Sequence, residues 1–290
     1  MNRKIGAKEI AAFEAHLRLG ERSSGTIEKY LRDIRAFAMW LGERPLDKEA
    51  AIAWKEHLRT KHYAPATVNS MLIAVNQLFR FLRWDDLRVK TVRIQRQIFR
   101  RRDKELTKEE YVRLLETARG LGRERLALLM EAICATGIRV SEVQYITVES
   151  AGAGRADITM KGKIRTILLP GRLRRKLLKY AKKRNIKSGE IFLTKTGKGM
   201  SRRQIWAEMK AICEKAGVSA SKVFPHNLRH LFARTFYKAC RDVVQLADVL
   251  GHSSVETTRI YLISTGDEHA RRMDRLGLVF DENSHKIKIL

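Results

Sequence analysis

Apolar side chains recur at intervals of three and four residues through the first 84 positions, a spacing that places them on one face of an α-helix. One such stripe occupies residues 30–41 and another occupies residues 68–82. Asp47 stands where a helix N-cap is expected, and Pro65 stands where a first helical turn tolerates proline. This region shows no strand signal. We therefore expect residues 7–84 to form four helices in a small all-helical domain.

The remainder of the chain adds one pair of strands to further helical segments. The segment ADITMKGKIRTILLP predicts a β-hairpin with strands Asp157–Met160 and Arg165–Leu169. IRVSEVQYITV predicts a short helix, with Ser141 as its N-cap, followed by a strand. Helical patterns follow the hairpin, and Gly251 is expected to end the helix over Asp242–Leu250. The fold class expected for the whole chain is mainly α with a small antiparallel β-sheet.

A strongly basic segment separates the two regions. We expect a helical domain over residues 1–87, a basic linker over 88–103 and a second domain with a C-terminal tail over 104–290. Such a run is typical of a solvated linker, but between two folded parts of a basic protein it can equally follow a phosphate backbone. The side chains expected to contact DNA are Arg93, Arg96, Arg100, Arg101, Arg102, Lys163, Arg202 and Arg203.

The formal net charge of +27 favours a polyanionic partner, above all nucleic acid, since lysine and arginine displace counterions from phosphates. An anionic membrane surface is the competing partner, but the charge is spread over both halves of the chain. No apolar run approaches the length of a membrane span, and the N-terminus does not resemble a signal peptide. We expect a cytoplasmic, nucleoid-associated protein that does not bind membranes. The three cysteines lack metal-site spacing and are expected to be buried, reduced thiols.

Six polar residues in the second region are not explained by capping or by a solvated face: Arg139, Lys161, His226, Arg229, His252 and Tyr261. His226 and His230 have the spacing of a helical zinc pair, but Asn227 stands where a metalloprotease needs glutamate. Arg229 would also place a positive charge beside the metal. We therefore expect no metal, and a structural role for His230.

These six groups together match the needs of phosphodiester cleavage. Two arginines can bind the non-bridging oxygens of the phosphate, on which negative charge accumulates in the transition state. A lysine can protonate the departing 5′-oxygen, and a tyrosine can attack the phosphorus once neighbouring cations and a histidine assist its deprotonation. Arginines that stabilise the transition state in this way leave no need for a metal or another cofactor.

The order of these residues resembles that of the tyrosine recombinases, the phage-type and Xer-type integrases. ATGIRVSE resembles the box of the first arginine, MKGKIRTILLP the hairpin with the catalytic lysine, HNLRHLFA the His-x-x-Arg box, and LGHSSVETTRIYL the histidine followed nine residues later by the nucleophile. The four boxes occupy residues 135–262, and the N-terminal helical region is similar in size and position to the core-binding, SAM-like domain of the family.

The resemblance implies a role for each of the six residues. Arg139 and Arg229 would hold the scissile phosphate, and His252 would donate a hydrogen bond to it. Lys161 would protonate the 5′-oxygen, His226 would assist as an acid or base, and Tyr261 would form a 3′-phosphotyrosyl bond. It also implies a homotetramer on two double-stranded DNA duplexes, each clamped between the two domains, with the tail after Tyr261 packed on a neighbouring protomer. No metal or ATP would be needed, because the phosphotyrosyl bond conserves the energy of the phosphodiester.

The sequence departs from the family pattern at the hairpin, where the lysine lies one residue from its commonest spacing, so Lys163 is a second candidate for its role. Two other functions stay open: DNA relaxation like that of a type IB topoisomerase, and DNA binding by a catalytically silent protein of this fold. Within the family that the sequence resembles, mobile-element integration and chromosome-dimer resolution both use this two-domain architecture.

The spacing of His252 and Tyr261 makes a geometric prediction. A straight helix through both would separate them by about 13 Å along its axis, at a rise of about 1.5 Å per residue. If both act at one phosphate, the helix must begin after His252 and end before Tyr261.

Overall fold

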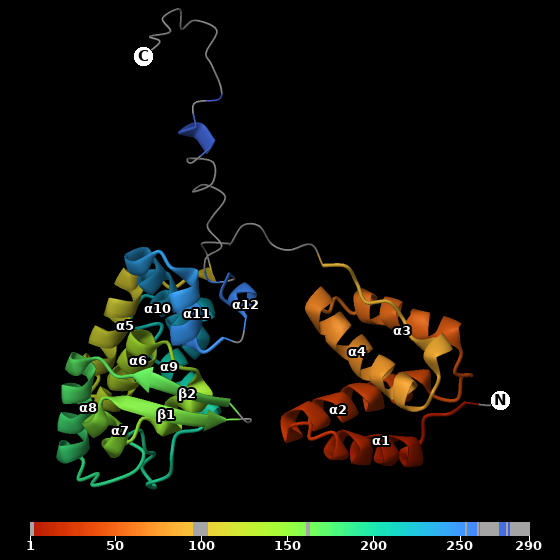
Figure 1. The fold of residues 1–290 in the computed structure, drawn as a ribbon, viewed down its shortest axis with the longest axis horizontal. Helices are drawn as coiled ribbons and strands as arrows, with labels where there is room; N and C mark the ends of the chain where they lie inside the picture. The colour runs from red at the N-terminus through yellow and green to blue at the C-terminus, as the bar shows by residue number, and fades with distance from the viewer. Residues whose placement is uncertain are drawn as a thin grey trace, which may run out of the picture. The chain divides into compact units, whose positions relative to one another are not determined.

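The computed structural model describes residues 3–94, 104–160, 163–252, 254–259, 261, 273–276 and 278. The chain divides into two compact units, residues 1–96 and residues 97–290. Each unit has its own hydrophobic core, and each is drawn in Figure 1. Among the described residues, no helix is long and apolar enough to cross a membrane.

The described part of the first unit contains four α-helices and one 3₁₀ turn, as expected from the apolar stripes. They are α1 (Ala7–Leu19), α2 (Ser24–Leu41), α3 (Lys48–Thr60), α4 (Pro65–Phe81) and η1 (Asp85–Leu87). The carboxylate of Asp47 accepts a hydrogen bond from the Ala50 amide at 2.7 Å and caps α3, and Pro65 begins α4. The buried faces of the helices meet around Phe37, which packs against the rings of Trp54 and Phe79.

The segment after η1 is fixed to α4 rather than free. The side-chain amide of Asn76 bonds both backbone groups of Val89 at 2.8 and 2.9 Å, and Asn69 bonds those of Val92 in the same way at 2.9 and 2.7 Å. Val89 is also buried in the core of the first unit. Val89 and Val92, which lie in the predicted linker, are therefore held against α4 by two asparagines that replace the hydrogen bonds of a strand partner.

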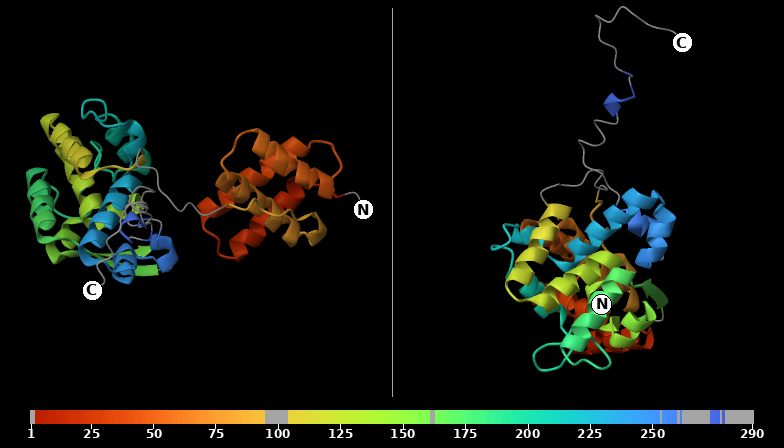
Figure 2. Two further views of the ribbon diagram at one scale, coloured as in Figure 1. Left: turned by 90° about the horizontal axis from the view of Figure 1, so that it is seen from above. Right: turned by 90° about the vertical axis from the view of Figure 1, so that its left-hand side faces the viewer.

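The second unit is mixed, with one hairpin among helices. Its described elements are α5 (Lys108–Gly120), α6 (Glu124–Thr136), η3 (Val140–Tyr145), α7 (Val148–Ala153), β1 (Arg155–Met160), β2 (Lys163–Leu168), α8 (Gly171–Lys183), α9 (Arg202–Lys210), η4 (Ala220–Lys222), α10 (Pro225–Cys240), α11 (Val243–Leu250) and α12 (Val255–Arg259). Figures 1 and 2 place α8 and α12 at opposite sides of this unit.

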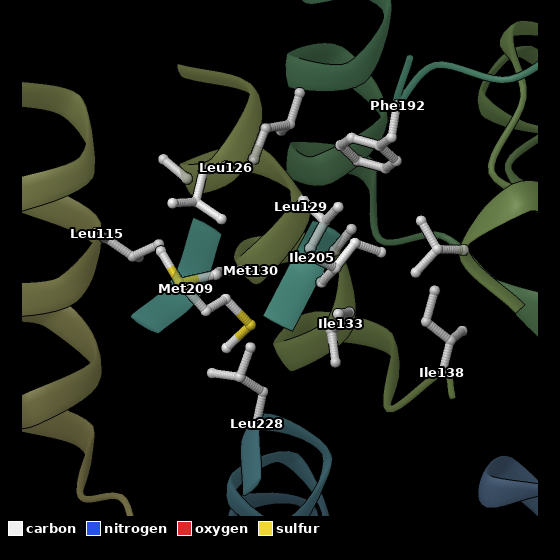
Figure 3. Packing of buried hydrophobic residues seen from close by; sticks show 14 of the residues in the cluster. Leu115, Leu126, Leu129, Met130, Ile133, Ile138, Phe192, Ile205, Met209 and Leu228 are labelled. Atoms are coloured by element: carbon white, nitrogen blue, oxygen red, sulfur yellow. The ribbon is translucent and has the colours of Figure 1, made fainter. Parts of the chain in front are cut away.

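Helix α6 forms the centre of the second core. Eight of its 13 residues are buried, as expected for a helix that other elements enclose on most sides. Figure 3 shows Leu129 and Ile133 of α6 packed beside Ile205 of α9, with Leu115 of α5 and Leu228 of α10 closing the cluster. This packing holds the ends of α6 and α10 in fixed positions, and both ends contribute to the site described below.

The hairpin pairs β1 and β2 in antiparallel register, with Met160 opposite Lys163 and Ile158 opposite Arg165. The predicted hairpin is confirmed. The predicted strand after η3 is wrong, because Thr147 makes a reciprocal capping box with Ser150 and starts α7 instead. Arg139, not Ser141, occupies the N-cap of η3.

The cysteine prediction is wrong in one position. Cys213 is buried and Cys134 is half-buried, as expected, whereas Cys240 is exposed at the end of α10.

Candidate active site

Arg229 is the centre of the candidate site. It lies on α10 and is only 1% exposed. Its guanidinium donates to the carbonyl of Gly137 and, at 2.9 Å, to that of Leu250, and it lies 2.9 Å from Nε2 of His252. Burial lowers the pKa of Arg229, yet an arginine side chain stays protonated in proteins. A permanent cation therefore joins the end of α6, the end of α11 and the turn after it.

Arg139 lies beside Arg229 but is open to solvent. Its guanidinium lies 2.9 Å from a carboxylate oxygen of Glu142 and donates to the Gly251 carbonyl at 3.4 Å, while 40% of its side chain remains exposed. Gly137 makes the turn that leads to it: φ is +65°, and an added Cβ would lie 2.4 Å from the ring of Phe232. A guanidinium that is held at one edge and exposed at the other can bind a phosphate from solution.

Glu142 and Arg165 belong to this site, and the sequence reasoning missed both. Glu142 is 3% exposed, accepts from the Arg139 amide at 2.8 Å and lies 3.2 Å from the Arg165 guanidinium. A signal was present in the sequence: Glu142 stands three residues after Arg139, the spacing at which a carboxylate can accept from the backbone amide at the start of a helix. No comparable local signal marks Arg165, because its partners are distant in the chain.

His252 is held from both sides of its ring. Nε2 faces the Arg229 guanidinium, which can only donate, so we assign the proton to Nδ1, which lies 2.8 Å from the Thr258 hydroxyl. Burial lowers the pKa of His252 to about 4, and the charges of Arg229, Arg139 and Arg165 act in the same direction. His252 is therefore neutral at physiological pH in the free protein.

Tyr261 is both packed and placed at the site. It is 2% exposed in a cluster with Ala233, Leu246 and Leu250, and its interaction with Arg229 opposes the burial that lowers the pKa of that arginine. Its ring stacks on that of His252 with centroids 5.7 Å apart. The geometric prediction is confirmed: α12 begins after His252 and ends before Tyr261.

Two histidines of α10 lie on the other side of Tyr261. The centroid of the Tyr261 ring lies 4.3 Å from that of His230 and 6.0 Å from that of His226. His230 is 8% exposed, whereas His226 is exposed and can exchange protons with solvent. Among the described residues, no group of three or more His, Cys, Asp or Glu side chains is arranged to hold a metal ion.

The structure thus brings together five of the six residues expected to act in catalysis: Arg139, His226, Arg229, His252 and Tyr261. The sixth, Lys161, lies outside the described residues, and Lys163 is described only as the first residue of β2.

Of the expected DNA contacts, Arg93 is exposed near the end of the first unit, and Arg202 and Arg203 are exposed at the start of α9. Arg96, Arg100, Arg101 and Arg102 lie outside the described residues.

The pKa of His252 predicts a pH dependence of stability in the absence of DNA. In the unfolded chain the group titrates near its ordinary value of about 6.5, so between pH 6.5 and about 4 the unfolded state binds a proton that the folded state excludes. The contribution of His252 to the free energy of unfolding is therefore complete above pH 6.5 and declines as the pH falls toward 4. Urea denaturation at pH 5 and pH 7 should show a smaller acid-induced loss for His252→Asn than for the wild type. Equal losses would contradict the assignment of a neutral His252.

The chain is similar to known proteins over most of its length. A model of the phage integrase family matches residues 104–267, and a model of the phage integrase N-terminal SAM-like domain matches residues 10–86. Tyrosine recombinase XerA of Thermococcus kodakarensis is 30% identical over 272 residues, which cover 91% of this chain and 93% of that protein.

Two solved structures are similar in fold at lower identity. The XerH site-specific recombinase bound to its difH substrate gives a TM-score of 0.66 at 20% identity, covering 94% of this chain and 85% of that one. A lambda integrase tetramer bound to a Holliday junction gives 0.71 at 18% identity, covering 88% and 76%.

Proposed function

Because the chain belongs to the phage integrase family of tyrosine recombinases, we propose that Tyr261 is the nucleophile with which this site-specific recombinase cuts and rejoins DNA. The observation that carries the proposal is that three segments bring Tyr261, Arg229 and His252 together. Tyr261 follows α12, Arg229 comes from α10, and His252 comes from the turn after α11. No packing requirement explains why a buried tyrosine should meet a buried arginine and a neutral histidine.

The reaction is a transesterification at phosphorus. Arg139 and Arg229 bind the non-bridging oxygens, and His252 donates a hydrogen bond to the same phosphate from Nε2, to which its proton moves when the phosphate replaces the contact with Arg229. The phenolic oxygen of Tyr261 loses its proton to a neighbouring base, which we propose to be His226, and attacks the phosphorus. The bond from phosphorus to the 5′-oxygen breaks, and Lys161 supplies the proton that this oxygen needs. The products are a 3′-phosphotyrosyl bond and a free 5′-hydroxyl.

Rejoining is the same reaction in reverse with the 5′-hydroxyl of another strand. The phosphotyrosyl bond and the phosphodiester are both phosphate diesters, so one is exchanged for the other and ATP is not required. The two arginines supply the electrostatic stabilisation that a metal provides in other phosphotransfer enzymes. Both features are consequences of the proposed roles of Tyr261, Arg139 and Arg229.

Strand exchange requires several copies of the chain. We assign the active form as a homotetramer on two duplexes, with the segment after Tyr261 packed against a neighbouring protomer. The lambda integrase tetramer on a Holliday junction supports this assembly. The side chains proposed to contact the DNA backbone, at which positive charge contributes affinity without reading sequence, are Arg93, Arg96, Arg100, Arg101, Arg102, Lys163, Arg202 and Arg203.

The experiment starts by finding the target. Footprinting with the purified protein identifies a protected duplex, and two copies of that site are then placed on one supercoiled plasmid. A recombinase yields inverted or excised products that depend on both sites. Relaxation that is independent of the sites would instead indicate a type IB topoisomerase activity, and protection without any cleavage would indicate a silent DNA-binding protein.

A further inference from the structure

Arg165 lies in the site but has no place in the reaction proposed above. It stands on β2 opposite Ile158, and its side chain leaves the hairpin to reach the turn after α11, with 14% of it exposed. Its Nη1 donates to the carbonyl of Leu250, and its Nη2 lies 3.2 Å from Glu142. Figure 1 shows β2 on the side of the second unit where α11 and α12 lie.

The two groups that Arg165 contacts, the Leu250 carbonyl and the Glu142 carboxylate, also hold the phosphate-binding arginines. The Leu250 carbonyl also accepts from Arg229 at 2.9 Å, and the Glu142 carboxylate also accepts from Arg139 at 2.9 Å. Arg165 therefore connects the Leu250 carbonyl, which holds Arg229, to the Glu142 carboxylate, which holds Arg139. A shift of β2 would move both of these groups at once.

Gly251 fits against the shaft of Arg165. Its φ of +62° favours glycine, and an added Cβ would lie 2.4 Å from both Cδ and Nη1 of Arg165. The next residue is His252, so the position of Arg165 fixes how closely the turn that carries His252 approaches the hairpin.

Burying Arg165 in this way lowers the free energy of unfolding, so a purely structural role does not explain it. Burial and the charges of Arg229 and Arg139, opposed by Glu142, together lower the pKa of Arg165 to about 10. Among the described residues, Nε and Nη2 of Arg165 are buried and make no hydrogen bond, so Nη2 meets Glu142 as an ion pair without hydrogen-bond geometry. A buried cation with unsatisfied donors is disfavoured against an apolar side chain of similar size, so stability alone does not account for it.

We propose that Arg165 is a positioning residue that fixes β2 to the turn at Leu250–His252 and to Glu142, and so holds Arg139, Arg229 and His252 in the geometry that binds the scissile phosphate. The proposal rests on the proposed function, because it assigns to Arg165 the alignment of that catalytic site. Arg165 acts through the other residues and does not touch the DNA.

The first test measures single-turnover formation of the covalent adduct on a nicked duplex that carries the protected site. Arg165→Ala is expected to form the adduct about 10 to 100 times more slowly at saturating DNA, since a displacement of about 1 Å at a reacting group has an effect of this size. DNA affinity should change less than about threefold, because backbone contacts elsewhere supply it. Arg165→Lys should recover part of the rate, since one ammonium can reach one of the two acceptors.

Arg125 offers a matched control. It also joins a carboxylate to a carbonyl, pairing with Glu208 at 2.5 Å and donating to Leu193, and it is 23% exposed. Arg125→Ala removes a similar bridge and should leave the rate of adduct formation unchanged within about threefold. An Arg165→Ala variant that cleaves at the wild-type rate, or an equal loss in both variants, would overturn the proposal.

A double-mutant cycle with Gly251→Ala tests the contact itself. The strain of alanine at this φ is present in both backgrounds and cancels, whereas the clash with the arginine shaft exists only when Arg165 is present. The two rate losses should therefore multiply to more than the loss measured in the double variant. Losses that multiply fully would show that the turn and Arg165 act independently.

Adduct formation by the wild type and by Tyr261→Phe tests the proposed reaction separately from the role of Arg165. An adduct in the wild type that is absent from Tyr261→Phe establishes the reaction whatever Arg165 does. If the wild type forms none, the proposed function fails before Arg165 is tested.

Discussion

Tyr261→Phe is expected to abolish covalent attachment to DNA while leaving the protein folded and able to bind its site. The phenolic oxygen is the only atom removed, and it is the atom that would form the bond to phosphorus. We expect adduct formation to fall by more than about 1,000-fold, the scale seen when a nucleophile is removed. The measurement is denaturing electrophoresis of a labelled, nicked duplex after incubation with the protein.

The folding stability of Tyr261→Phe, unlike its cleavage rate, is expected to change little. The phenyl ring of the variant keeps the packing against His230, Ala233, Leu246 and Leu250, and only the contact between the hydroxyl and Arg229 is lost. The free energy of unfolding should therefore change by about 1 kcal/mol.

Tyr237→Phe is the matched control, since Tyr237 packs against the same apolar cluster. It should form the adduct at the wild-type rate. An adduct in Tyr261→Phe would place the nucleophile elsewhere and remove the basis of the proposed mechanism.

Arg229→Lys is expected to cause the second large loss. Lysine keeps the positive charge but offers one ammonium in place of a planar group with five donors. In the structure the guanidinium donates to two backbone carbonyls and also contacts the side chains of His252 and Tyr261. Adduct formation should fall by about 100 to 1,000-fold, the usual effect of losing a preorganised donor to the transition state. Because Arg229 is 1% exposed, the unfilled hydrogen bonds should also lower the unfolding temperature.

A second variant in α10 separates the loss of phosphate binding from the loss of stability. Arg234 of α10 pairs with Glu105 and donates to the Leu106 carbonyl at 2.8 Å, so Arg234→Lys also disturbs a network between an arginine, a carboxylate and a carbonyl. It should lower the unfolding temperature without a comparable loss of cleavage. If Arg229→Lys and Arg234→Lys lose cleavage in proportion to their lost stability, Arg229 is structural and does not bind the phosphate.

Much of the local structure was predictable because it depends on neighbours in the sequence. The four helices of the first unit follow from apolar spacing, and the caps at Asp47 and Thr107 form with amides three residues away. The strand expected after η3 failed for a related reason. Thr147 and Ser150 satisfy each other's backbone amides, and this local pairing outweighs the β propensity of the segment.

The site was predictable in part. Arg139, Arg229, His252 and Tyr261 are recognisable from residue type and order, and the spacing of the last two requires a break in the helix between them. Arg165 was missed because its partners are specified by no local pattern, whereas the spacing of Glu142 from Arg139 was a local signal that was overlooked. Arg165 meets the Leu250 carbonyl across 85 residues of chain, and Arg229 meets Gly137 across 92.

The sequence by itself determined the helices, the hairpin, the basic character of the chain and the residue types available for phosphate chemistry. Only the tertiary structure decided that Tyr261 packs against the ring of His252, that burial keeps His252 neutral, and that Arg165 lies between Glu142 and the Leu250 carbonyl. Periodicity and capping act over a few residues and are visible in the sequence. Burial, desolvation and the sharing of one carbonyl by two arginines arise only when α6, α10, α11 and the hairpin pack together.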